Sequence, residues 1–298
     1  METFDIKFEE PDERVSQSAI KIIGVGSRGG HIVDNLCIKG LSNTKVDFAL
    51  IDYDQRTLGS KRSAAEKICI AKECSDIDKR LRAIIGEWRM VIILIAELDV
   101  DYNAYIVSSL CRLFHHTSND DEIVRRVSLV FPIISSKTEK SGYNSAFGLA
   151  SIEAMATKVI PYENEQFVYG IVNSICQTVH NPNLAYNQVD YNDFATVFQY
   201  GQKAIAVTGE DLLYRCAETA AINLKHKIEE TGSSVHSIRY IYLHFGITHI
   251  EQCTVAQIFE MFDTFCKSFD FPVNVLRSFT ESSIDNCNLA TYSAIAMI

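Results

Sequence analysis

The sequence predicts an α/β fold in which helices cover both faces of a parallel sheet. Apolar, β-branched runs of strand length recur through the first half of the chain, and stretches with helical periodicity separate them. Continuous apolar runs are typical of strands buried on both faces, and their alternation with helices is typical of parallel sheets. The chain has 298 residues, of which 47% are hydrophobic. It is long enough to bury a sizeable core, and we expect two domains.

Strands and helices alternate in the predicted first half. Its longest apolar run, Met90–Ala96, has the length of a buried strand. Strands are predicted over 18–24, 46–52, 90–96 and 127–134, and helices from a start near Gly29 and over 77–87 and 102–114.

A helix over 165–180 is the best marked element of the sequence. Pro161 precedes it, and Asn181-Pro182 is expected to end it. Its apolar residues fall on one stripe at helical spacing: Phe167, Val168, Ile171, Val172, Ile175 and Val179. Such a stripe needs burial along its whole length, so we expect 163–182 to pass between a domain over 1–162 and a domain over 183–298.

The second half is predicted to form a smaller α/β domain. A polar loop over 183–193 leads into it. Apolar runs and helical stretches alternate again after this loop. The expected strands are 203–207, 238–245, 272–278 and 289–298, and the expected helices are 210–230 and one that starts at Thr254.

Composition excludes several classes of partner. The formal net charge of −10 argues against nucleic-acid binding and against attraction to anionic lipid. No apolar run approaches the roughly 20 residues of a membrane span, so no direct membrane insertion is expected. The acidic N-terminus is unlike a secretory or transit signal. Nine cysteines without a Cys-x-x-Cys pair indicate reduced thiols and a cytoplasmic location. No histidine or cysteine spacing suits zinc, and no metal site is expected.

A glycine-rich turn between the first strand and the first helix is the candidate binding site. Gly24, Gly26 and Gly29 are spaced as in phosphate-binding turns. Glycines let backbone N–H groups approach an anion, and the helix N-terminus adds partial positive charge. The same spacing also occurs in tight turns that hold no ligand. With Asp52 at the end of the second strand to bond a ribose hydroxyl, it fits an NAD-binding Rossmann domain as well.

Four blocks, in order along the chain, point to one family. They are 20–36 with the glycine turn, 48–58 with an Asp-x-Gln-x-Leu pattern, the helix over 165–180, and 189–198. The blocks resemble, in the same order, the first nucleotide loop, the second strand and loop, the central helix and the synergy loop of FtsZ, the bacterial relative of tubulin. The resemblance implies a tubulin/FtsZ-type α/β fold: a Rossmann-like parallel-sheet domain, a central helix and a smaller α/β C-terminal domain.

The resemblance also implies a nucleotide site. Its cofactor would be GTP or GDP, and its residues would be Gly24, Gly26, Ser27, Arg28, Gly29, Gly30, Asp52 and Asp54. The synergy-loop signature is Asn-x-Asp-Phe-x-Asp, and here Gln188 stands in place of the Asn while Asp190 and Asp193 remain. In the family this loop enters the site of the next subunit, where its carboxylates polarise the attacking water, so hydrolysis requires self-association. Alternatively, the two aspartates cap or solvate a turn, with Asp193 as N-cap of a short helix at Phe194.

The chain departs from the family where the second phosphate loop should be. The segment 97–104 has no glycine or threonine and carries Glu97, Asp99 and Asp101. Side chains would obstruct close backbone approach, and carboxylates repel phosphate, although Arg28 could offset one of them. The third loop, 71–74, is altered as well, a helix near the guanine site is missing before the central helix, and His31 replaces the usual asparagine.

These features predict a divergent FtsZ-like cytoskeletal protein of prokaryotic type with a degenerate GTP site. We expect a non-hydrolysing structural or regulatory protein in cell division or membrane remodelling, which binds no nucleotide and acts through self-association or through FtsZ-like or other protein partners. One alternative is a polymerising GTPase that binds GTP in an altered pose. Another is an NAD-binding Rossmann oxidoreductase.

Overall fold

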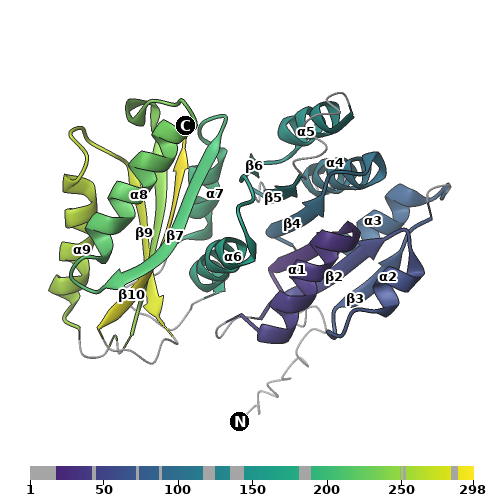
Figure 1. The fold of residues 1–298 in the computed structure, drawn as a ribbon, viewed down its shortest axis with the longest axis horizontal. Coiled ribbons are helices and arrows are strands. Elements are labelled where there is room, and N and C mark those ends of the chain that lie inside the picture. Colours follow the sequence, from purple (N-terminus) through teal and green to yellow (C-terminus); the bar gives the residue numbers. More distant parts are fainter. Residues whose placement is uncertain are drawn as a thin grey trace, which may run out of the picture.

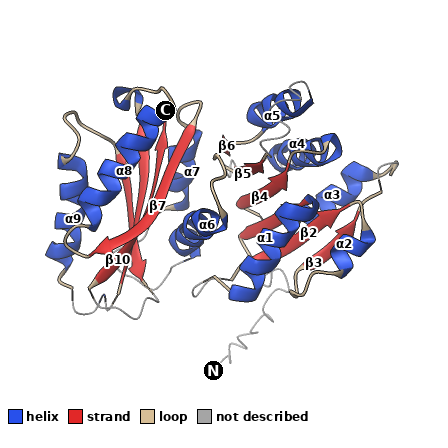
Figure 2. Ribbon diagram, in the orientation of Figure 1, coloured by secondary structure: helices blue, strands red, loops and turns tan. Residues whose placement is uncertain are grey.

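Two sheets lie side by side with helices between them (Figure 1). The computed structural model describes residues 18–298 except 42–44, 72–73, 87–88, 117–124, 135–143, 181–188, 249, 251–252 and 283–287. Figure 2 shows that helices lie on both sides of the first sheet, whereas the second sheet carries two long helices on its outer face. The acidic N-terminus, Asn181-Pro182 and Gln188 lie outside the described residues.

Six parallel strands form the first sheet, in the order β3-β2-β1-β4-β5-β6. The central strands are fully buried, as the continuous apolar runs predict. The strands are β1 Ile20–Val25, β2 Asp47–Asp52, β3 Glu66–Cys69, β4 Val91–Glu97, β5 Val127–Ile133 and β6 Lys158–Val159.

Side chains of each central strand alternate between two separate cores. In β4, Ile93 and Ile95 face the core that contains the central helix, while Ile92 and Leu94 face the opposite core. This alternation follows from the two-residue period of a strand, and it requires apolar residues at every position. The helices on the two faces are α1 Gly26–Lys39 and α2 Gln55–Gly59 on the first, and α3 Ile77–Ile85, α4 Asp101–His116 and α5 Asn144–Met155 on the second.

The central helix α6, Glu165–His180, joins the two halves. Its buried residues Phe167, Val168 and Ile171 belong to the same apolar core as β4 and as Tyr242 and Ile295 of the second sheet. The expectation that this helix is buried between two sheets is confirmed.

The second sheet has four strands in the order β7-β10-β8-β9. Strand β10 runs antiparallel to both of its neighbours, and β9 runs parallel to β8. Its elements are α7 Tyr191–Gln199, β7 Ala204–Leu212, α8 Cys216–Glu230, a 3₁₀ turn Val235–Ser237, β8 Tyr240–Ile247, α9 Val255–Lys267, β9 Val275–Glu281 and β10 Leu289–Met297. Helices α8 and α9 cover the outer face, and α7 packs on the inner face through Phe194 and Phe198.

Several boundaries differ from the sequence-based expectation. The first helix begins at Gly26 and not near Gly29, and Gly26 itself has a positive φ of +76°. The helix expected over 210–230 begins at Cys216, since β7 continues through Leu212 as the partner of β10. Strands β3 and β6 and helices α2 and α5 were not expected: the two strands are short edge strands, and α5 shows no amphipathic period.

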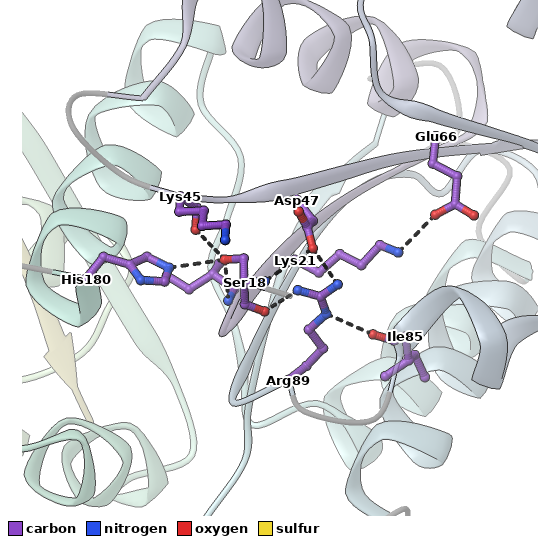
Figure 3. Close-up of polar contacts among 9 residues, drawn as sticks. Ser18, Lys21, Lys45, Asp47, Glu66, Ile85, Arg89 and His180 are labelled. Atoms are coloured by element: carbon purple, nitrogen blue, oxygen red, sulfur yellow. Dashed lines mark hydrogen bonds and ion pairs between the residues drawn. The ribbon is translucent and has the colours of Figure 1, made fainter. Parts of the chain in front are cut away.

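A buried arginine links several elements at the amino-terminal edge of the first sheet. The side chain of Arg89 is 5% exposed and forms an ion pair with Asp47 at 2.5 Å. Its other donors reach the carbonyl oxygens of Ile85 and Ser18. Figure 3 shows that Ser18 also faces His180 at the end of α6, with 3.3 Å between the hydroxyl and Nε2. This cluster therefore ties β1, β2, α3 and the central helix together.

Replacing this arginine tests the role of the cluster. We expect Arg89→Met to lower the free energy of unfolding by about 3 kcal/mol, because the carboxylate and two carbonyl groups lose a buried cationic partner. Arg112→Met is the matched control: Arg112 pairs with Asp78 at 2.9 Å, but both side chains are more than a third exposed. Its loss should cost less than about 1 kcal/mol in urea denaturation. Equal losses in the two variants would contradict the assignment.

Candidate functional site

The glycine turn lies where the strand order of the first sheet reverses. The neighbours of β1 are β2 on one side and β4 on the other, so the carboxyl ends of β1 and β4 lie at the point where the strand order reverses. In open α/β sheets ligands bind at such switch points. The order of this sheet is also that of dinucleotide-binding domains. The glycine turn alone therefore cannot distinguish the two families that the sequence suggested.

Close packing accounts for the glycines of the turn. A Cβ on Gly29 would overlap the carbonyl oxygen of Ile95, and one on Gly24 would lie 2.7 Å from the carbonyl oxygen of Gly29. Gly26 has a φ of +76°, and a Cβ there would overlap the side-chain amide of Asn103. Side chains are thus excluded whether or not a ligand binds, because α1 rests directly on β4.

A carboxylate of the chain itself occupies the N-terminus of α1. The residue before this helix is Val25, which offers no side-chain cap. Instead, the Glu97 carboxylate accepts a hydrogen bond of 3.1 Å from the backbone N–H of Arg28. Asn103 holds the same strand end by donating to the carbonyl oxygen of Glu97 at 2.9 Å. Helix N-termini attract anions through their free N–H groups and dipole, and here a side chain provides the anion.

The neighbouring charges are arranged around Arg28. Its guanidinium lies 3.6 Å from the carboxylate of Asp99, in agreement with the expectation that Arg28 offsets one acidic residue. The Lys61 ammonium donates to the carbonyl oxygen of Ser27 at 3.2 Å, close to Gly30. The side chains around the glycine turn therefore include both cations and carboxylates.

Asp52 and Asp54 stabilise local turns. The Asp52 carboxylate, which is 5% exposed, accepts the backbone N–H of Asp54 at 2.9 Å. Asp54 in turn caps α2 by accepting the N–H of Arg56 at 2.9 Å. Asp52 lies at the carboxyl end of β2, on the same edge of the sheet as the glycine turn.

A buried aspartate on α1 was missed by sequence reasoning. Asp34 on α1 is buried and accepts the backbone N–H groups of Arg62 and Ser63. Burial raises its pKa, but these hydrogen bonds outweigh burial, and the pKa lies below its usual value. The signal was an acidic residue among the buried positions of α1, which needs partners to be stable there.

Asp190 and Asp193 lie at the opposite edge of the first sheet. The hydroxyl of Tyr191 is within hydrogen-bonding distance of the carbonyl oxygens of Met90 and Arg125, which precede β4 and β5. The N-cap of α7 is Asp190, which accepts the N–H of Asn192 at 2.8 Å; the expectation that Asp193 caps this helix is wrong. The exposed Asp193 lies in its first turn. One subunit therefore cannot bring these aspartates to its own glycine turn.

Comparison with solved structures identifies the fold. The chain superposes on a point mutant of FtsZ from M. jannaschii with a TM-score of 0.77 over 96% of this chain and 92% of that chain, at 12% identity. The chain has the FtsZ/tubulin fold. An empty FtsZ dimer from the same organism gives a TM-score of 0.72 at 12% identity, over 94% of this chain and 88% of that one. CetZ2 from Haloferax volcanii, solved as a GTPγS-bound protofilament, gives 0.60 at 13% identity, over 93% and 92%. No family model and no curated protein matches the chain.

The FtsZ/tubulin fold confirms the predicted architecture of a Rossmann-like sheet, a central helix and a smaller α/β half. In the described part of the chain no helix is long and apolar enough to cross a membrane. Those same residues contain no group of three or more His, Cys, Asp or Glu side chains that could hold a metal ion. Between β6 and α6, residues 160–164 form no helix.

Glycine substitutions test the packing explanation. We expect Gly29→Ala to destabilise the protein by about 1–3 kcal/mol, because the new methyl group meets backbone atoms of β4 that cannot rotate away. Gly59→Ala in α2 is the matched control, since a Cβ there meets nothing within 4 Å. It should be neutral or slightly stabilising. Thermal unfolding of both variants measures these changes in stability. A Gly29→Ala protein as stable as the unmodified chain would contradict the packing described for α1.

Proposed function

We propose that this chain is an FtsZ/tubulin-like cytoskeletal protein whose nucleotide site is degenerate. It acts as a non-hydrolysing structural or regulatory protein in cell division or membrane remodelling. The fold, shared over nearly the whole length of FtsZ and CetZ structures, supports the cytoskeletal part of this proposal.

The contact between Glu97 and the N-terminus of α1 carries the rest of the proposal. A phosphate bound by the glycine turn would need the N–H group that this carboxylate already accepts. It would also approach the carboxylate of Asp99, which forms an ion pair with Arg28 at 3.6 Å. An incoming phosphate must therefore displace Glu97 and bear the repulsion of a second carboxylate, which favours an empty site.

Two alternatives were left open by the sequence. GTP binding in an altered pose would rely on Asp52 or Asp54, but both carboxylates are engaged in capping backbone N–H groups. An NAD-binding oxidoreductase would have the same order of strands in the first sheet. The second sheet and the central helix, which superpose on FtsZ together with the first, favour the cytoskeletal interpretation.

The first test is a nucleotide titration. We expect the purified protein to show no saturable binding of fluorescent GTP or GDP and no phosphate release above a no-enzyme control. Glu97→Ala should not restore hydrolysis, because the segment 97–104 still lacks a glycine-rich loop. Turnover by the unmodified protein that Asp190→Ala abolishes would instead establish a polymerising GTPase. A bound cofactor that absorbs like a nicotinamide would favour the oxidoreductase.

The second test concerns self-association. Head-to-tail stacking would bring Asp190 and Asp193 of one subunit toward Glu97 and Asp99 of the next, and these acidic sets repel each other. We therefore expect a monomer or small oligomer at low salt, and stacking that strengthens with added salt or divalent cation. Sedimentation and electron microscopy across a salt series, with and without GTP, measure this. GTP-dependent filaments at low salt that disappear in an Asp190→Ala, Asp193→Ala variant would overturn the expectation.

A further inference from the structure

A group of cations lies where β3 forms one edge of the first sheet. Its members are Arg56 of α2, Lys61 and Arg62 between α2 and β3, and Lys67 of β3. Three of the four side chains are exposed, and that of Lys61 is half-buried. Strand β3 has β2 as its neighbour on one side and no strand of the described chain on the other, at the opposite end of the sheet from β6 (Figure 1). We call these four residues together with β3 the basic edge.

No carboxylate neutralises the basic edge. Among the described residues, none of its four cations forms an ion pair. The ammonium of Lys67 donates to the carbonyl oxygen of Lys61 at 2.6 Å, and that of Lys61 donates to the carbonyl oxygen of Ser27 at 3.2 Å. The carboxylate next to them, Glu66, pairs with Lys21 at 3.0 Å (Figure 3). In a chain of net charge −10, such a group of cations favours an acidic partner.

The backbone that carries these cations is held in place. The buried carboxylate of Asp34 accepts the N–H of Arg62 at 3.1 Å and the N–H of Ser63 at 2.8 Å. The contact between Lys67 and Lys61 joins the same segment to β3. Because this surface is ordered before a partner arrives, binding costs less conformational entropy.

Strand β3 also offers backbone groups for pairing. Ile70 donates its N–H to the carbonyl oxygen of Asp52 at 3.0 Å, which continues the parallel register of Asp52 with Cys69. Backbone groups of successive residues in a strand point to opposite sides, so the N–H and C=O groups of Lys67 and Cys69 point away from β2. An extended peptide can pair with such an edge by strand addition.

The charge of the edge determines which chain can pair there. A lysine on an edge strand opposes pairing with a neutral or basic strand, whereas opposite charges on neighbouring strands attract. A long nucleic acid would bring many phosphates close to a chain of net charge −10, and its backbone has no peptide groups to pair with β3. An acidic peptide satisfies both the cations and the strand.

We propose that the basic edge binds an extended, acidic peptide segment of another protein. The segment adds a strand beside β3 and forms backbone hydrogen bonds with Lys67 and Cys69. Its carboxylates pair with Arg56, Arg62 and Lys67. This inference is independent of whether the glycine turn binds a nucleotide.

Fluorescence anisotropy on the full-length chain tests the proposal. The probe is a labelled peptide of alternating glutamate and valine, and the comparison ligands are its lysine–valine counterpart and a single-stranded oligonucleotide. We expect saturable binding of the acidic peptide alone, and binding that weakens with added salt because screening reduces the attraction. An Arg62→Ala, Lys67→Ala variant should bind it about fivefold more weakly, the effect of losing two exposed ion pairs.

A matched variant separates the basic edge from the overall charge. Lys79→Ala, Arg82→Ala removes the same charge from exposed positions of α3, on the other face of the first sheet. It should leave binding of the acidic peptide unchanged. An equal loss in both double variants would show attraction without a site and would overturn the proposal.

A proline substitution tests the added strand. Cys69→Pro removes an N–H that points away from β2, a change that an edge strand tolerates, and should weaken peptide binding by about fivefold. Cys69→Ala is its control and should bind as the unmodified chain does. Circular dichroism checks that each variant is folded. Preferential binding of the oligonucleotide or the lysine peptide, self-association through Arg62 and Lys67 without peptide binding, or full binding by the folded Cys69→Pro variant would each overturn the proposal.

Discussion

The burial of α6 on two sides is the constraint on which the rest of this structure depends. A single apolar core contains residues of β4 and β5, the stripe of α6, and Tyr242 and Ile295 of the second sheet. The two halves therefore share a core, and neither could move far from the other without exposing this helix to water. The buried side chain of Lys158 adds a polar tie, since its ammonium donates to the carbonyl oxygen of Gly201 at 3.0 Å. The edges of the first sheet and of the second are thus held in one arrangement.

That arrangement gives the glycine turn its particular chemistry. Because α1 begins directly after a strand and its N-cap is a valine, its first N–H groups have no side-chain acceptor on the helix itself. The end of the adjacent strand β4 lies within reach, and Glu97 at that position supplies the acceptor. A glycine there would leave the N–H groups open to an external anion. The residue at the end of β4 thus supplies the acceptor for one N–H group at the N-terminus of this helix.

The fold could be predicted from the sequence, but only part of the candidate site could. Long periodic segments such as 90–96 and 165–180 were predicted closely, because their apolar patterns report burial directly. Edge strands β3 and β6 were missed because two to four residues carry no pattern of their own. The cap of α7 was misassigned by three positions, since both Asp190 and Asp193 are suitable caps and only backbone geometry separates them. The acceptor role of Glu97 could be anticipated only as unfavourable charge, because its hydrogen bond joins residues 69 positions apart.

A cleft of about 530 Å³ lies between α6 and the second sheet, and the sequence does not reveal it. The helix approaches the second sheet closely at Gly170, where a Cβ would lie 2.5 Å from the hydroxyl of Thr208 and where Ser293 donates to the glycine carbonyl. Further along this face of α6, the polar residues Asn173 and Gln177 stand at positions where apolar residues would continue a water-free contact with the sheet. Polar side chains on a buried helix face cannot close against a sheet without partners, because each unpaired group costs free energy. The helix is therefore held against the sheet both at its glycine and by polar side chains that find partners on the strands, as Gln177 does in accepting from Thr280 at 2.9 Å.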